Sequence, residues 1–279
     1  MGVLDLTATW PVPTVAAAIL DGDRVVERIG STNQRFAVAS LAKPVSAWGM
    51  LVAVEEGVIA LDSPVGQPGC TLRHLLAHAG GYPFNGHEPI APIERTRTYS
   101  NGGIELAADA VATAAEMPFA HYLYDAVLAP LGMTESELAG SPAHGLRTSV
   151  DDLAALLRET RAPTLITVDT AADAVRTQYP GLSGIVPGVG RFEQCPWGLG
   201  FEIRGDKQPH WTGHANAPTT YGHFGGAGTM MWRDPTADVA VVALTDRPFD
   251  EWGSTALQRW PELSDAALAA YGATGGRPA

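Results

Sequence analysis

The order of strand-like and helix-like segments is the feature that most constrains the fold of this chain. Two β-like runs near the start flank residues 21–23, whose Asp-Gly-Asp sequence is typical of a hairpin turn. Helical segments follow, strand-like runs return within residues 198–245, and a final helix, broken or started afresh at Pro261, is expected over residues 254–270. Strands from both ends of the chain therefore enclose a helical middle.

We predict an α+β fold, an α/β sandwich in which helices cover one antiparallel sheet built from both chain ends. The sheet region would comprise residues 1–60 and 185–279, and residues 61–184 would form an inserted, mostly helical region. The cleft between these two regions is where we expect a site. Residues 178–196 are rich in Gly and Pro and are expected to form a long loop beside it.

A Ser-x-x-Lys sequence, Ser40 to Lys43, opens the first predicted helix. Pro44 is tolerated only in the first turn of a helix, so this helix begins at or just after Ser40. Ser40 and Lys43 would then lie one turn apart on the same face. A lysine that is removed from water can activate a serine as a nucleophile once its pKa falls from about 10.4. The free N–H groups at the helix start would favour a developing oxyanion.

A single Ser-x-x-Lys occurs often by chance, but two later stretches contain residues that suit the same chemistry. Residues 98–102 read Thr-Tyr-Ser-Asn-Gly in a polar segment between helices, and residues 223–226 read His-Phe-Gly-Gly in a Gly-rich run that leads into a strand. No serine lies in a G-x-S-x-G sequence, which argues against an α/β-hydrolase. With these three motifs the chain resembles the serine β-lactamase and penicillin-binding protein superfamily.

The resemblance looks closest to the class C branch, which includes β-lactamases, D,D-peptidases, D-aminopeptidases and carboxylesterases. Further stretches that resemble this family are residues 75–81, 130–133, 197–201 and 223–246. Together with the motifs they cover most of the chain in the family's order. The fold that the resemblance implies is the same sheet with a helical insertion.

The resemblance also implies a role for each motif residue. Ser40 would attack a substrate carbonyl and become acylated, while Lys43 and Tyr99 would share the transfer of protons. Which of the two is the general base stays open. Asn101 would donate its amide N–H to a substrate carbonyl and steady Lys43. The backbone N–H groups of Ser40 and Gly226 would form the oxyanion hole.

The third motif, residues 223–226, would form the substrate-binding edge of the cleft. Gly225 and Gly226 suit a strand edge that a substrate approaches closely. His223 departs from the β-lactamases of the family, in which a lysine usually provides a fixed cation for the substrate carboxylate. A histidine with an ordinary pKa near 6.5 is mostly neutral at neutral pH. This difference favours uncharged esters or amides over β-lactams.

We therefore predict a serine hydrolase that acts through an acyl-enzyme on Ser40, of the carboxylesterase or peptidase type, with small ester or amide substrates. One alternative is a β-lactamase, D,D-peptidase or D-aminopeptidase. A second alternative is a catalytically weak homologue that only binds a ligand. The presence of Ser40, Lys43, Tyr99 and Asn101 together favours a hydrolase, because a binding protein has no need of all four.

Composition and charge limit the partners that this chain would bind. The 279 residues carry a formal net charge of −12, which argues against nucleic acid and anionic membranes. Residues 1–13 lack a basic region followed by an apolar run, and no apolar run reaches the roughly 20 residues of a membrane span. We expect a cytoplasmic protein whose partner is a small-molecule substrate. The sequence leaves the oligomeric state open.

No cofactor and no metal are expected from the sequence. His74 and His78 have the i, i+4 spacing of a metal pair, but no Glu follows His74 as in H-E-x-x-H and no third ligand is evident. We interpret both histidines as structural residues.

Overall fold

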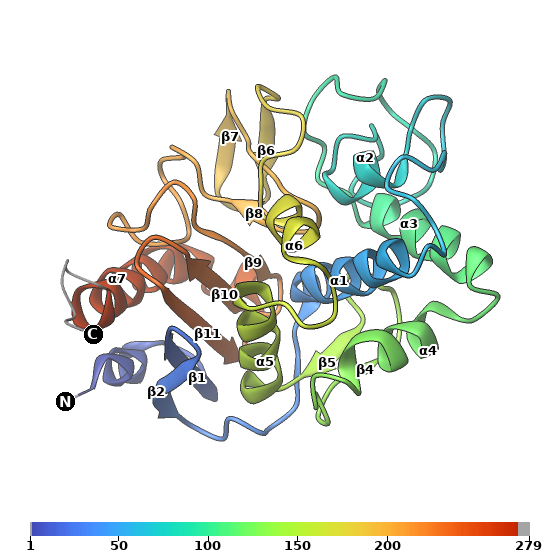
Figure 1. The fold of residues 1–279 in the computed structure, drawn as a ribbon. Helices are drawn as coiled ribbons and strands as arrows, with labels where there is room; N and C mark the ends of the chain where they lie inside the picture. The colour runs from blue at the N-terminus through green and yellow to red at the C-terminus, as the bar shows by residue number, and fades with distance from the viewer. Residues whose placement is uncertain (1, 273–279) are drawn as a thin grey trace.

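In the computed structural model, which describes residues 2–272, strands from both ends of the chain form one antiparallel sheet. Figure 1 shows the blue N-terminal strands next to the red C-terminal strands. The sheet has six strands in the order β2-β1-β11-β10-β9-β8, which confirms the predicted α+β fold. Their bounds are β1 (Val15–Asp21), β2 (Arg24–Ile29), β8 (Glu202–Ile203), β9 (Tyr221–Gly225), β10 (Thr229–Asp234) and β11 (Val239–Thr245).

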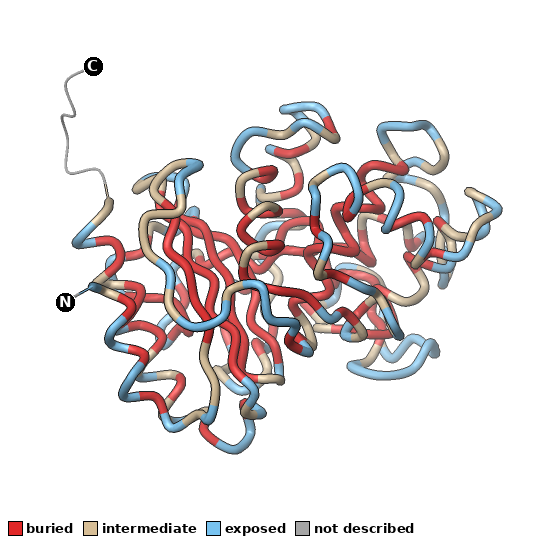
Figure 2. Tube along the Cα trace, turned by 90° about the horizontal axis from the view of Figure 1, so that it is seen from below, coloured by how far each residue is buried: buried red, intermediate tan, exposed pale blue. Residues whose placement is uncertain are grey.

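The two chain ends meet where β1 pairs with β11. The pairing runs from Val15 opposite Thr245 to Asp21 opposite Val239. Both strands are almost continuously apolar and buried, the pattern expected for strands that are covered on both faces. Figure 2 shows these buried strands enclosed between segments whose outer surfaces are exposed.

Alternate residues of β1 contribute to two different hydrophobic clusters. Ala16, Ala18 and Leu20 pack with helices α1 (Ala42–Glu55) and α5 (Val150–Arg161) on one face. Ala17 and Ile19 pack on the other face with the C-terminal helix α7 (Gly253–Tyr271). The period-2 alternation of a strand thus places a helical layer on each side of the sheet.

Helix α7 continues through Pro261, so the predicted break at this residue is wrong. Trp260, Leu263 and Ala267 are buried in one cluster with strand residues of the sheet. We attribute the continuity to this packing, because it holds both halves of the helix against the sheet although a proline lacks the N–H of a helical hydrogen bond.

The middle of the chain forms the helical region that lies beside α1. Helix α5 falls within the predicted insertion, residues 61–184, but packs against β1 and β11, so the sheet layer also draws on this part of the chain. The other elements of the middle are α2 (Leu72–Leu76), α3 (Asn101–Ala114), α4 (Phe119–Leu123), η3 (Tyr124–Leu128), β4 (Glu137–Leu138), β5 (Leu146–Thr148) and α6 (Val168–Ala174). Strands β4 and β5 form a small sheet with β3 (Phe36–Ala37), which precedes the middle.

Residues 178–196, expected to be a long loop, contain a hairpin of β6 (Gly184–Val186) and β7 (Gly190–Phe192). Of the Gly and Pro residues that suggested a loop, Pro187 and Gly188 lie at the hairpin turn, where Gly188 has a φ of +78°. Short 3₁₀ turns complete the fold: η1 (Val3–Thr9), η2 (Ala39–Leu41) and η4 (Phe249–Glu251). Over residues 2–272, the helices are all too short or too polar to cross a lipid bilayer.

Candidate active site

Ser40 lies in the 3₁₀ turn η2, directly before helix α1. The preceding residue, Ala39, has a φ of +46°, a left-handed conformation that residues with a Cβ rarely adopt. Backbone strain of this kind is often retained at functional sites. Ala39 and Ser40 both line a cavity of about 400 Å³.

Lys43 is completely buried in the first turn of α1 and lies beside Ser40. Its Nζ is 3.1 Å from Ser40 Oγ, 2.6 Å from Asn101 Oδ1 and 3.0 Å from the Ala143 carbonyl oxygen. All three partners are uncharged. Burial therefore lowers the pKa of Lys43 to about 7, although the charge of Glu105 opposes the shift.

The protonation of Lys43 decides what its contacts can do. A neutral amine has two N–H groups, which would donate hydrogen bonds to Asn101 Oδ1 and to the Ala143 carbonyl oxygen. Its lone pair would then point to Ser40 Oγ and accept the hydroxyl proton. With a pKa near 7, a large share of the molecules carries this neutral amine at neutral pH.

Tyr99 comes from the segment before α3 and reaches the same place. Its Oη is 3.4 Å from His223 Nε2, and Lys43 Nζ is 4.6 Å from the centre of its ring. Burial raises the pKa of Tyr99 well above the ordinary value, and a hydrogen bond with the Ser40 side chain only partly opposes this. Tyr99 is therefore a neutral phenol at neutral pH, which can donate a proton.

Asn101 is the first residue of α3 and links two parts of the site. Its Oδ1 accepts from Lys43, as the sequence motif implies, while its Nδ2 donates to Asn85 Oδ1 at 2.9 Å. The amide has a second N–H, which is the one that a substrate carbonyl would accept. Asn85 was not singled out from the sequence. In the structure the following residue, Gly86, has a φ of +99°, which marks a turn.

His223 lies on β9 and is buried. Its Nδ1 is 2.6 Å from the Phe224 carbonyl oxygen and donates to it, so Nε2 faces Tyr99 Oη as an acceptor. Burial, together with the nearby charge of Lys43, lowers the pKa of His223 to about 4. The histidine is neutral at neutral pH, as its residue type suggested.

The end of β9 approaches the Ser40 turn closely. A Cβ at Gly225 would collide with the Val38 carbonyl oxygen and lie 3.2 Å from the Ser40 backbone nitrogen. Only glycine permits this approach. Gly226 has open space around its Cα and lines the same cavity as Ser40. The structure thus brings together the residues that the three motifs indicated.

The cavity also contains residues that the sequence did not indicate. Glu202 is buried at its wall and accepts from Lys207 at 3.0 Å, from His210 at 3.1 Å and from Trp211 at 2.7 Å. Burial opposes ionisation of Glu202, but Lys207 and His210 outweigh it and lower its pKa. A lone Glu in a strand gives no sequence signal for such a network. A larger crevice of about 870 Å³ contains Lys207 but none of the motif residues.

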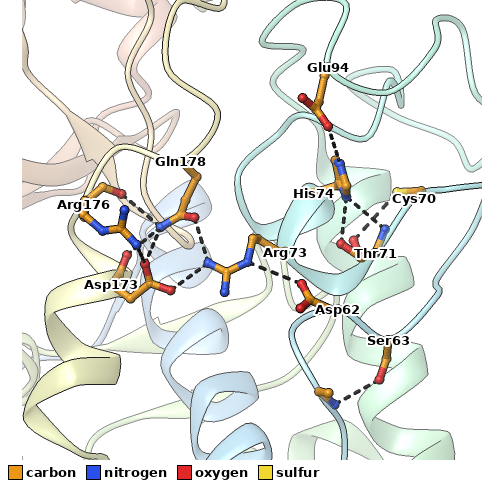
Figure 3. Close-up of polar contacts among 11 residues, drawn as sticks. Asp62, Ser63, Cys70, Thr71, Arg73, His74, Glu94, Asp173, Arg176 and Gln178 are labelled. Atoms are coloured by element: carbon orange, nitrogen blue, oxygen red, sulfur yellow. Dashed lines mark hydrogen bonds and ion pairs between the residues drawn. The ribbon is translucent and has the colours of Figure 1, made fainter.

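The two histidines of the i, i+4 pair have different surroundings. His74 lies between Thr71 and Glu94, with Nδ1 2.7 Å from Thr71 Oγ1 and Nε2 3.0 Å from Glu94 (Figure 3). The same figure shows Arg73 joining α2 to Asp173 and Gln178. These contacts hold α2 in place, and His78 faces away from them toward Tyr99.

The sequence model of the Beta-lactamase family matches residues 6–260. The chain therefore belongs to this family, as its motifs predict. A crystal structure of a β-lactamase from Mycobacterium bovis is 43% identical to this chain and superposes with a TM-score of 0.94. The match covers 98% of this chain and 100% of that chain.

Two further matches are more distant. EstCE1, a hydrolase with promiscuous acyltransferase activity, shares 16% identity over 97% of both chains with a TM-score of 0.75, which shows the common fold. Penicillin-binding protein 4* from Bacillus subtilis is 28% identical, and the match covers 38% of this chain and 31% of the length of that protein.

Proposed function

We propose that this protein is a serine hydrolase that forms an acyl-enzyme on Ser40 and acts on small, uncharged ester or amide substrates. The contact that carries this proposal is Lys43 Nζ lying 3.1 Å from Ser40 Oγ with its pKa lowered to about 7. A base with a pKa near the working pH is the most effective, and a positioned base accelerates a reaction by roughly 10²–10⁴-fold.

In acylation, the neutral amine of Lys43 takes the proton of Ser40 as Oγ attacks the substrate carbonyl carbon. The N–H groups of Ser40 and Gly226 donate to the oxyanion that forms. Tyr99 passes a proton to the leaving group, which departs as an alcohol or amine and leaves an ester on Ser40. The raised pKa of Tyr99 keeps its hydroxyl protonated in the resting enzyme, which supports Lys43 as the resting base.

In deacylation, water attacks the ester carbonyl carbon and releases the acid. Tyr99 takes a proton from this water, and Lys43 returns the proton that it took in acylation to Ser40 Oγ. His223 Nε2 holds Tyr99 Oη from the other side as a neutral acceptor. No net proton is taken up by the three residues over a full cycle.

The lining of the cavity supports an uncharged substrate with an apolar acyl group. Within the part of the chain that the structure describes, no Lys or Arg side chain lines this cavity, and Asp250 adds a negative charge to its wall. A carboxylate on the substrate would therefore meet no lysine or arginine in this wall. The larger apolar residues of the wall are Phe84, Val186, Pro187, Trp197, Phe224 and Phe249.

The experiment compares hydrolysis of p-nitrophenyl butyrate with that of nitrocefin by the wild type and by Ser40→Ala. We expect kcat/KM to be higher for the ester and both activities to disappear in Ser40→Ala. A fluorophosphonate should add one adduct to the wild type in an intact-mass measurement and none to the variant. An unlabelled wild type would favour a protein that only binds its ligand.

β-Lactam hydrolysis is the second candidate, favoured by the description of the 43% identical M. bovis protein as a β-lactamase. A nitrocefin kcat/KM well above that for the ester would support it and overturn the substrate class proposed from His223.

A further inference from the structure

A buried histidine next to Tyr99 makes contacts that the proposed mechanism does not use. His78 follows α2 and is 2% exposed. Its φ of +54° places it in the left-handed region, which is uncommon for a residue with a Cβ. Both the burial and the backbone conformation indicate that neighbouring segments constrain this residue.

The backbone on both sides of Tyr99 is held by His78. The N–H of Thr98 donates to the His78 carbonyl oxygen at 2.9 Å, and the N–H of Ser100 donates to His78 Nδ1 at 3.2 Å. One residue therefore accepts from the residues immediately before and after Tyr99.

The imidazole ring of His78 also contacts the phenol itself. Its centre is 4.8 Å from the centre of the Tyr99 ring and 5.0 Å from that of Trp197. Because Nδ1 accepts from Ser100, the proton of the neutral ring lies on Nε2. Among residues 2–272 this buried atom has no hydrogen-bond partner. Burial, with the nearby charge of Lys43, keeps the pKa of His78 well below its ordinary value, so Nδ1 remains an acceptor at neutral pH.

We propose that His78 is a positioning residue that sets the place of the Tyr99 hydroxyl. By holding Thr98 and Ser100 it also fixes the start of α3, where Asn101 meets Lys43. The proposal rests on the proposed function, because the position of Tyr99 matters only if Ser40 is acylated. A buried N–H without a partner and a left-handed backbone both lower stability, and such features are retained at functional sites.

Two variants separate the two parts of the His78 side chain. His78→Phe keeps an aromatic ring beside Tyr99 but removes the acceptor of the Ser100 N–H. His78→Asn keeps a side-chain acceptor near the Nδ1 position and tolerates the left-handed backbone, but removes the ring.

His74→Phe is the matched control. His74 lies one turn earlier in the same segment, and its ring also makes hydrogen bonds, to Thr71 and Glu94, away from the cavity (Figure 3). This variant would lower stability without moving Tyr99.

The measurements are the rate of Ser40 labelling by a fluorophosphonate, kcat and KM for p-nitrophenyl butyrate, and Tm. We expect His78→Phe to lower the labelling rate and kcat by about 10- to 100-fold with KM little changed, because one buried N–H loses its acceptor. His78→Asn should retain most of the wild-type labelling rate and kcat. His74→Phe should lower Tm without a selective fall in kcat. Equal falls in His78→Phe and His74→Phe, in proportion to Tm, would overturn the positioning role.

A measurement on the wild type tests the same inference without a variant. The ¹⁵N NMR spectrum of His78 at neutral pH should show a proton on Nε2 and none on Nδ1. A proton on Nδ1 would overturn the proposal even if His78→Phe failed to fold. An unlabelled wild type would instead overturn the proposed function.

Discussion

The molecule contains two buried lysines whose partners differ in charge. Lys207, whose side chain is wholly buried, lies 3.0 Å from the carboxylate of Glu202 and also donates to the Ile203 carbonyl oxygen. Lys43 is equally buried, but its three partners are all neutral. The first lysine forms an ion pair that fixes the wall of the cavity. Within residues 2–272 the second contacts no carboxylate, and its lowered pKa is what the proposed function requires of a base.

The comparison shows that burial alone does not give a lysine a chemical role. When a lysine with a carboxylate partner is buried, its ammonium group loses its interactions with water but gains an ion pair with the carboxylate. Where only carbonyl, amide and hydroxyl groups surround the amine, the neutral form becomes accessible near pH 7, as the lowered pKa of Lys43 indicates. The charge of Glu105 opposes this shift without removing it.

Lys43→Met would have the largest effect on activity. We expect kcat/KM for p-nitrophenyl butyrate to fall by roughly 10²–10⁴-fold, because Ser40 loses its base. The free energy of unfolding should change much less than in a lysine with a charged partner, because no charge is stranded. Activity within tenfold of the wild type would mean that another group is the base.

Lys207→Met would affect stability instead. Removing one member of a buried ion pair costs about 3–5 kcal/mol, because Glu202 would keep a charge without its partner. Urea unfolding followed by fluorescence measures this loss. Adding Glu202→Gln to the variant removes the stranded charge and should recover part of the stability. A loss in Lys207→Met no larger than in Lys43→Met would contradict the comparison.

The pH dependence of kcat/KM gives the smallest but most specific effect. Below about pH 7 the amine of Lys43 is protonated, so kcat/KM should fall as the pH falls. Well below this pH the fall should approach about tenfold per pH unit, and above pH 7 kcat/KM should level off. The pKa of His223, lowered to about 4, leaves that residue neutral over this range.

Glu105→Gln tests the assignment of this acid limb to Lys43. Removing a negative charge that raises the pKa of Lys43 should move the midpoint of the profile to lower pH. An unchanged midpoint would assign the limb to a different group.

The sequence predicted the features that depend on local spacing. Ser40 and Lys43 are three residues apart at the start of a helix, so their contact follows from helical geometry once the helix start is known. The strands at both chain ends were also evident, because apolar runs bounded by turn residues indicate strands. The break at Pro261 was wrong, because packing of α7 overrode the local signal. The loop over residues 178–196 contains a hairpin that was not predicted, because pairing of β6 with β7 formed two short strands within it.

Tertiary structure alone decided the surroundings of the two lysines. Tyr99 and His223 are 124 residues apart in the chain and meet only because β9 lies beside the Ser40 turn. No motif indicates the Ala143 carbonyl oxygen, and the family-like stretch over residues 75–81 did not predict that His78 would contact Tyr99. Side-chain identity and local spacing are properties of the sequence. The electrostatic environment of a buried amine depends on which distant groups surround it, and folding alone brings these groups together.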